Sequence, residues 1–433
     1  MQQLIPSKLA RVGRRIRGIY LPLILGSTLA VIQDTRANMV SDWNANLNTA
    51  IRTANAPSPI PPIRVAAIVN ACIFDAVNGI ARQYTPCFVP AEAPGGANQD
   101  AAAAQAAYTA LVALYPAQKA TLDAQLAASL NTVPGHQGKS RAIARGRAWG
   151  ETVAKTILTW RAGDGFNTTP APYFGSTTIA GVWRSVPDAT KPAVFPQVAT
   201  MEPFAILNHD QFRPGPPPAL TSAEYAASLN ELKAIGGVVS SRTPAQSETA
   251  RLWNAVNVAD ELEAASPLVP ADASLVDTAR FFTLLSVAGV DALIAGMDSK
   301  YVYNLWRPYH AIPLADTDGN PATIADPTWS PFLTTPGHQE YISNHSVITG
   351  AFIRILSALI GNDNEITFGA SGLPGVSHTF THLSDAVDEV KEARIYAGFH
   401  FRFSVNKGQE VGYDIADWIF THYLLPVKDS DSD

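Results

Sequence analysis

The sequence has few cysteines and few charged residues, and both shortages narrow the class of protein. Cys72 and Cys87 are its only cysteines among 433 residues, so a zinc site with four cysteine ligands is excluded. The two thiols leave two alternatives open, a disulfide and a pair of unbonded core thiols. Charged residues make up 16% of the chain and hydrophobic residues 47%, a composition typical of a globular protein and not of a disordered one.

Positive charge is scarce beyond the N-terminus. Residues 1–37 carry six basic side chains and one acidic one, so the chain's net charge of −6 leaves −11 for the remainder. Nucleic-acid binding requires a basic surface, and we therefore expect no nucleic-acid partner. Asp291 and Arg354 interrupt the two best later apolar runs, so the sequence predicts a soluble protein without a stable membrane span.

The first 37 residues have the pattern of an export signal. A basic stretch containing "GRRIRG" precedes the apolar "IYLPLILGSTLAVI", and "DTRANM" follows it. This order predicts that residues 1–37 direct export to the periplasm or the exterior. The alternative is that the segment is a helix kept in the mature protein.

Strand signals are sparse, whereas helical spacing of apolar residues recurs along the chain. We therefore predict an all-α fold of packed helical bundles. The expected helical segments are 64–84, 99–131, 138–162, 221–237, 243–264, 271–298, 346–360, 383–397 and 406–424. We divide the chain after the signal into an N-terminal helical region, 38–270, and a C-terminal helical region, 271–433. The first contains an irregular stretch, 164–218, of a length typical of functional loops.

The C-terminal region begins with two cations at helical spacing. "KYVYNLWRP" places Lys300 and Arg307 seven residues apart, which predicts nearly one face of a helix that Pro308 ends. Later, "ARIYAGFHFRFS" brings Arg394 and His400, with Gly398 between them as a possible break.

Between these motifs, "YISNHSVITG" places Ser343, Asn344 and His345 at the start of an apolar helix. Such a helix start is either a plain cap or an anion site, because helix N-termini carry unpaired N–H groups and partial positive charge. The arginines and the lysine favour the second interpretation. Together these residues suit a compact tetrahedral oxyanion.

The motifs "K-x6-RP", "SNH" in place of P-S-G-H, and "AR-x5-H" in place of S-R-x5-H occur here in this order. The sequence thereby resembles the superfamily of vanadium haloperoxidases and acid phosphatases. "YNLWRP", "DTDGNPATIADPTW" and "QFRPGPPPALTSAEY" are similar to bacterial and plant haloperoxidase-like proteins and extend the resemblance over most of the chain. The resemblance implies helical bundles of the vanadium chloroperoxidase and acid phosphatase type.

The resemblance also implies a vanadate cofactor and a set of site residues. His400 would bond vanadium, and His345 and Lys300 would be catalytic. The groups expected to bind the vanadate oxygens belong to Lys300, Arg307, Ser343, Asn344 (through its backbone N–H) and Arg394. Hydrogen peroxide, a halide and a small organic acceptor would be the substrates, and phosphate would compete with vanadate. No oligomeric state follows from the sequence.

Four positions depart from the family pattern: Ile342, Asn344, Ala393 and Ser404. Ser404 stands where the superfamily's phosphatases have an aspartate, the expected orienting partner of a histidine nucleophile. Two alternatives to a haloperoxidase therefore stay open. One is an acid phosphatase acting through a phospho-histidine, and the other is a non-redox descendant of the family.

The same resemblance gives an expectation for the halide. Family chloroperoxidases carry an aromatic residue and a tryptophan where this sequence has His338 and Met297. The histidine resembles vanadium bromoperoxidases, and the methionine exchanges a rigid wall for a flexible thioether. We therefore expect a halide pocket at His338 and Met297 that favours bromide or iodide over chloride.

Two other patterns resemble metal sites. His378 and His382 have the i, i+4 spacing of zinc ligands on a helix, but no HExxH glutamate accompanies them. "DTDGN" at 316–320 resembles the start of a calcium loop, yet Pro327 occupies its twelfth position. We interpret the histidines as surface or core residues and "DTDGN" as a turn.

Overall fold

The computed structural model describes residues 38–133, 140–187 and 189–427, so the predicted export signal lies outside the described residues. Helices dominate this part, which confirms the all-α prediction. One antiparallel hairpin joins β1 (Ile366–Gly369) to β2 (Ser377–Phe380), with Ile366 opposite Phe380. The α-helices are α1 (Met39–Ala54), α2 (Ile60–Ala81), α3 (Gln99–Leu114), α4 (Lys119–Thr132), α5 (Ser140–Ala162), α6 (Ala223–Ile235), α7 (Pro244–Ala255), α8 (Val258–Ala265), α9 (Leu275–Tyr303), α10 (Pro308–Ala311), α11 (Asn344–Ile360), α12 (Leu383–Tyr396) and α13 (Arg402–His422).

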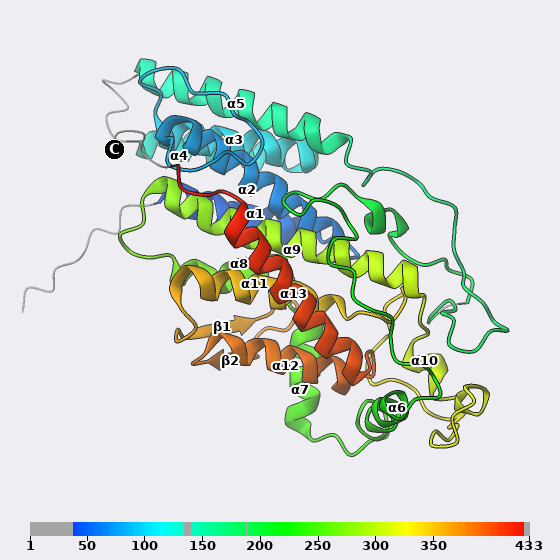
Figure 1. The fold of residues 1–433 in the computed structure, drawn as a ribbon. Helices are drawn as coiled ribbons and strands as arrows, with labels where there is room; N and C mark the ends of the chain where they lie inside the picture. The colour runs from blue at the N-terminus through cyan, green and yellow to red at the C-terminus, as the bar shows by residue number, and fades with distance from the viewer. Residues whose placement is uncertain (1–37, 134–139, 188, 428–433) are drawn as a thin grey trace, which may run out of the picture. The chain divides into compact units, whose positions relative to one another are not determined.

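Helix α9 is the centre of the packing (Figure 1). A capping box of Ser274 and Asp277 starts it, and nearly every residue from Val276 to Lys300 is buried. Helix α2 packs on α9, with α3 and α5 beyond it, while α11 contacts α9 from the side where α13 lies. Helices α11 and α13 approach closely, because a Cβ at Gly412 would lie 2.4 Å from the Val347 carbonyl oxygen.

Helices α2 and α9 are long and apolar enough to cross a membrane, but their apolar windows are 94% and 100% buried inside the protein. Both helices therefore lie in the core of the described part of the chain. One hydrophobic cluster runs through residues on both sides of position 270, so the division at 270 stays a prediction.

Two of the predicted helical segments are each divided into two helices in the structure. The segment 243–264 is two helices, α7 and α8, because Asn257 and Asp260 form a capping box between them. The segment 99–131, expected as one helix or a pair of helices, is a pair, α3 and α4, separated by the 3₁₀ turn Pro116–Gln118. Helix α1 and the β1–β2 hairpin were not predicted.

Both cysteines are unbonded, which decides between the two alternatives that the sequence left open. Cys72 is buried in α2, and the Cys87 sulfur lies 2.6 Å from the Tyr423 hydroxyl. Burial raises the pKa of both thiols well above the usual value, so they are packing residues rather than reactive groups.

The stretch 164–218 is irregular apart from the 3₁₀ helix Pro196–Thr200. A buried carboxylate fastens it to the core. Asp291 of α9 accepts hydrogen bonds from the backbone N–H groups of Phe204, Ala205 and Ile206 at 2.8, 2.8 and 3.0 Å. Asp291, the charged residue that interrupts the apolar run of α9, thus holds the 164–218 stretch against the core.

We expect Asp291→Ala to lower the free energy of unfolding by about 3 kcal/mol or more, because three buried N–H groups lose their acceptor. Thermal denaturation and limited proteolysis of the 164–218 stretch measure the effect. The control is Asp417→Ala, which removes an exposed ion pair with Arg354 and is expected to cost about 1 kcal/mol at most. Equal stability of the two variants would contradict the anchoring role.

Candidate active site

The first two predicted cations come from two different elements, so the prediction that they share one helix face is wrong. Helix α9 ends at Tyr303, and Asn304 adopts a left-handed conformation with φ 52°. Arg307 is extended and caps the short helix α10. The chain turn returns its side chain to the interior, where it is completely buried.

Arg307 is held by two segments that follow it in sequence. Its Nε donates to the His338 carbonyl at 2.8 Å, and its Nη1 donates to the Phe399 carbonyl at 2.9 Å. Nη1 also lies 3.0 Å from His400 Nε2, and Nη2 lies 2.9 Å from His338 Nδ1. Because a guanidinium can only donate, the contact with Arg307 makes His400 Nε2 an acceptor, whereas His338 Nδ1 lies between this donor and an acceptor, the Gln339 carbonyl at 3.1 Å.

His400 therefore carries its proton on Nδ1, and that proton has a partner. Nδ1 lies 2.8 Å from Glu340 Oε1, which also accepts from the Phe401 N–H at 3.0 Å. Gly398, with φ 81°, separates this segment from α12 and allows a close approach to the Gly236 carbonyl. Glu340 thus fixes the tautomer of His400, so Nε2 carries the lone pair that here accepts from Arg307.

Glu340 supplies the orienting carboxylate that the sequence lacked at Ser404. The sequence analysis missed it, although it stands only three residues before Ser343. Burial raises the pKa of Glu340 to about 7, against the lowering effects of Lys300, Arg307 and the Phe401 N–H. Its position in "QEYISNH", close to the helix start, is the signal that could have indicated this role.

Lys300 is also completely buried, but backbone groups occupy its ammonium. It donates to the carbonyls of Gln339 at 3.1 Å, Glu340 at 2.8 Å and Ile342. An ammonium has three protons, so Lys300 holds in place the irregular segment 339–342 that leads into α11. Its role as a direct vanadate ligand or a catalytic residue stays a prediction. Burial, and then the neighbouring charges of Arg307 and Arg394, lower the pKa of Lys300 well below its usual value.

The N-terminus of α11 begins where the sequence predicted a cap. Ser343 is the N-cap, and its Oγ accepts from the Ser346 N–H at 3.4 Å and from the Ser346 hydroxyl at 3.0 Å. The Asn344 side chain donates to the Met297 sulfur at 3.4 Å. Met297 is completely buried behind this contact.

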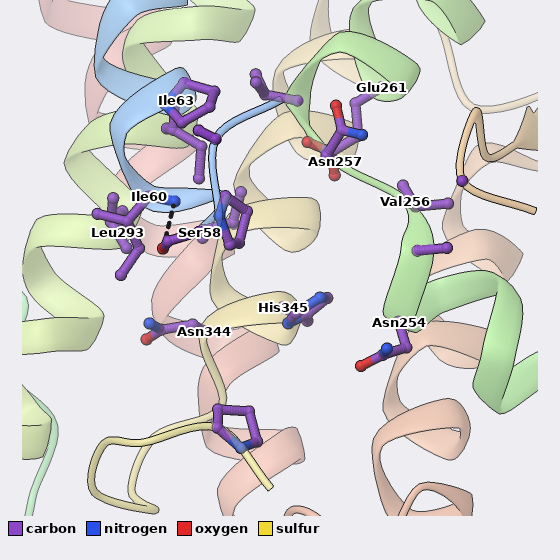
Figure 2. A pocket seen from close by; sticks show the side chains of 18 of the residues that line it. Ser58, Ile60, Ile63, Asn254, Val256, Asn257, Glu261, Leu293, Asn344 and His345 are labelled. Atoms are coloured by element: carbon purple, nitrogen blue, oxygen red, sulfur yellow. Dashed lines mark hydrogen bonds between the residues drawn. The ribbon is translucent and has the colours of Figure 1, made fainter. Parts of the chain in front are cut away.

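A cavity of about 720 Å³ reaches this helix start (Figure 2). Five of the predicted site residues line it: His338, Asn344, His345, Arg394 and His400. The other predicted residues, Lys300, Arg307, Ser343 and Met297, do not line it and are buried behind its wall.

Arg394 faces the cavity with spare hydrogen-bonding capacity. Its Nη1 donates to the Trp253 carbonyl at 3.4 Å, and its guanidinium carbon lies 4.7 Å from the centre of the Phe399 ring. Its buried Nε has no partner among the described residues. Burial and Arg307 lower the pKa of Arg394 to about 9, which still leaves it charged at neutral pH.

The histidines of this wall are neutral in the structure. Burial, followed by the charges of Arg394, Lys300 and Arg307, lowers the pKa of His345 well below its usual value. The same kinds of effect lower the pKa values of His338 and His400. His338, His345, Arg394 and His400 form the inner wall of the cavity. The two arginines, Arg307 and Arg394, keep pKa values of about 10 and about 9 and lie close to one carboxylate, so this wall has excess positive charge that an anion would neutralise.

The two alternative metal patterns do not form sites. His378 lies on strand β2, with Nδ1 2.6 Å from Glu389, whereas His382 precedes α12, with Nδ1 3.0 Å from Asp363. No cluster of three metal-ligating side chains occurs in the described part of the chain. Residues 316–320 comprise the end of the 3₁₀ helix Ala315–Thr317 and a bend, in which the Asp318 carboxylate accepts from the Thr323 hydroxyl at 2.8 and 3.0 Å.

Comparison with known proteins agrees with this geometry. Residues 280–428 match the family model of the VCPO second helical-bundle domain. None of the curated proteins matches the chain. The chain is similar to a bacterial vanadium-dependent iodoperoxidase, with a TM-score of 0.73 and 22% identity, covering 91% of this chain and 98% of that one.

The structure is also similar to a bacterial vanadium-dependent chloroperoxidase in two forms. The apo form gives a TM-score of 0.65 over 83% of this chain and 92% of that one, and the holo form gives 0.67 over 85% and 94%, both at 16% identity. The resemblance to the vanadium haloperoxidase superfamily is thereby confirmed. At these identities the matches establish the fold.

Proposed function

We propose that this protein is a vanadium-dependent haloperoxidase, which uses hydrogen peroxide to oxidise a halide to a hypohalous acid. The reaction consumes H₂O₂, X⁻ and H⁺ and yields HOX and water. The observation that carries the proposal is the Glu340–His400–Arg307 chain of contacts beside Arg394 and His345 at one helix start. It combines a histidine lone pair with cations around a cavity, as an oxyanion with a histidine ligand requires.

The residues present fit vanadate. His400 Nε2 would bond vanadium, and Arg307, which now donates to that nitrogen, would donate to an oxygen instead. Arg394 and the Asn344 N–H would hold further oxygens from the cavity side, while Lys300 would contribute charge from behind the wall. Bound vanadate would make peroxide electrophilic towards halide.

His345 would handle the protons of peroxide. Its ring lines the cavity, and its lowered pKa keeps it neutral, so it can take a proton before peroxide reacts. An anion on the inner wall would offset the cations that lower this pKa, so the histidine would hold the proton better once the site is filled.

The experiment is reconstitution of metal-free protein with vanadate. We expect triiodide from iodide and peroxide, and bromination of a phenol dye, only after vanadate is added. Phosphate added during reconstitution should inhibit, because it is a tetrahedral oxyanion of similar charge. Activity that is independent of vanadate, or absent at every vanadate concentration, would refute the proposal.

The second candidate is an acid phosphatase, and the Glu340–His400 contact favours it more than the sequence did. A histidine nucleophile needs a group that fixes its tautomer, and Glu340 provides one. Efficient hydrolysis of p-nitrophenyl phosphate by protein free of vanadate would place this function first.

We expect bromide and iodide to be oxidised faster than chloride, which is the hardest of the three to oxidise. His338 lines the cavity and contacts Arg307, so it can affect the field at the halide, whereas Met297 would act only through Asn344. His338→Phe is expected to change the ratio of chloride to bromide rates, measured at one pH and one peroxide concentration. An unchanged ratio would remove position 338 from the halide pocket.

A further inference from the structure

Glu261 is a buried carboxylate in the same cavity, without a role in the mechanism above. It lies on α8, is 6% exposed, and lines the cavity (Figure 2). Its Oε1 accepts a hydrogen bond from the Thr349 hydroxyl at 2.8 Å. Its second oxygen has no hydrogen bond to the described residues, so it is available to a molecule in the cavity.

The hydrogen bond from Thr349 relates the position of Glu261 to that of His345, the proposed acid–base residue. Thr349 follows His345 by four residues on α11, so the two side chains share a helix face and lie about 6 Å apart along the axis. Ile348 lines the same cavity. The Glu261 carboxylate and the His345 ring therefore belong to one cavity wall, about one turn of α11 apart.

Much of the cavity wall is apolar, although polar residues such as Ser58, Asn254 and Asn257 also line it. The apolar side chains are those of Ile60, Ile63, Phe195, Val256, Leu293 and Ile348. Halide and peroxide gain nothing from apolar walls, and a carboxylate repels halide. An aromatic ring with a hydrogen-bond donor gains from both features, because the walls cover the ring and the carboxylate accepts from the donor.

We propose that Glu261 determines specificity for the organic acceptor by accepting a hydrogen bond from the hydroxyl or amino group of a single aromatic ring. This inference rests on the proposed function for the source of hypohalous acid. The donor end lies at Glu261, and the opposite edge of the ring points to the inner wall, so halogenation occurs para to the donor. The ring carbon forms a bond to the halogen of HOX, the C–H bond breaks, and its proton leaves with the hydroxide of HOX as water.

The state of the carboxylate is consistent with this role. Burial raises the pKa of Glu261 to about 7, with Thr349 lowering it and Asp260 raising it. A donor from a phenol favours the ionised form in the same way as the Thr349 hydroxyl does. Thr349→Val, which keeps the side-chain shape, should therefore weaken phenol binding as well.

The first test is binding, because it does not depend on turnover. Calorimetry compares phenol with toluene, which has the same ring but no donor, on protein incubated with vanadate. We expect wild type to prefer phenol by about ten-fold, the size of one hydrogen bond to a charged acceptor. Glu261→Ala should lose that preference, and Glu261→Gln, which keeps an acceptor oxygen and the shape, should lose part of it. The matched control Glu263→Gln changes an exposed carboxylate outside this cavity and should keep the preference.

The second test is the position of bromination. Wild type should give a larger para share from phenol than hypobromous acid in buffer, and Glu261→Ala should bring that share to the buffer value with a KM for phenol raised about ten-fold. A wild-type isomer ratio equal to the buffer value, or an unchanged phenol preference in both Glu261 variants, would overturn the inference. Failure of wild type to oxidise iodide would instead refute the proposed function, and the binding test would still decide the role of Glu261.

Discussion

His400→Ala is expected to abolish vanadate-dependent halide oxidation, with a loss of at least about 10³-fold, the scale of removing a central group of an active site. The imidazole is the one side chain of the inner wall that presents a nitrogen lone pair fixed by a carboxylate. Its loss would remove the proposed bond to vanadium and leave the oxyanion to the cations alone. The measurement is the rate of triiodide formation across a vanadate titration.

The matched control for this variant is His382→Ala, because His382 is an exposed histidine paired with Asp363 at the surface. Circular dichroism and thermal denaturation should show folded protein for both variants. Activity of His400→Ala close to that of His382→Ala would contradict the role of His400 as the vanadium ligand and, with it, the use of this wall as the anion site.

The sequence predicted the helical class and the residues around the site because both depend on local signals. The helical spacing of apolar residues and the order of the three motifs can both be recognised in the sequence alone. The structure brings Arg394, His345 and His400 to one cavity, although they come from α12, α11 and the segment between α12 and α13. Their order in the sequence could suggest this arrangement only through the family resemblance.

The sequence-based predictions were wrong where a side chain's position or hydrogen-bond partner depends on tertiary contacts. Lys300 and Arg307 have helical spacing, yet Asn304 ends α9 and a turn carries Arg307 inward. The orienting carboxylate was expected four residues after His400, and it comes instead from Glu340, sixty residues before it. A buried contact between distant segments leaves no periodic pattern in the sequence. The pairing of Glu340 with His400 could therefore not be predicted from their spacing.

Glu340→Gln is the second variant with a large expected effect. The glutamine keeps an acceptor oxygen near His400 Nδ1 but removes the negative charge that lies among Lys300, Arg307 and His400. Loss of a partner that orients a metal-bound histidine commonly costs about 10- to 100-fold in metal affinity. We therefore expect the vanadate concentration needed for half-maximal activity to rise by about that factor.

The two candidate functions differ in whether more ligand can restore Glu340→Gln. In a haloperoxidase the defect is mainly in holding vanadate, so a high vanadate concentration should recover much of the rate. In a phosphatase the histidine must attack phosphorus in every turnover, so loss of the orienting negative charge would lower kcat at any substrate concentration, by as much as about 10⁴-fold for a comparable carboxylate-to-amide change. Glu410→Gln, an exposed change beside Lys407, is the control for general loss of carboxylate charge. A vanadate titration of Glu340→Gln that coincides with wild type would show that Glu340 does not orient the ligand. Hydrolysis of p-nitrophenyl phosphate by wild type that Glu340→Gln loses at every substrate concentration would favour the phosphatase.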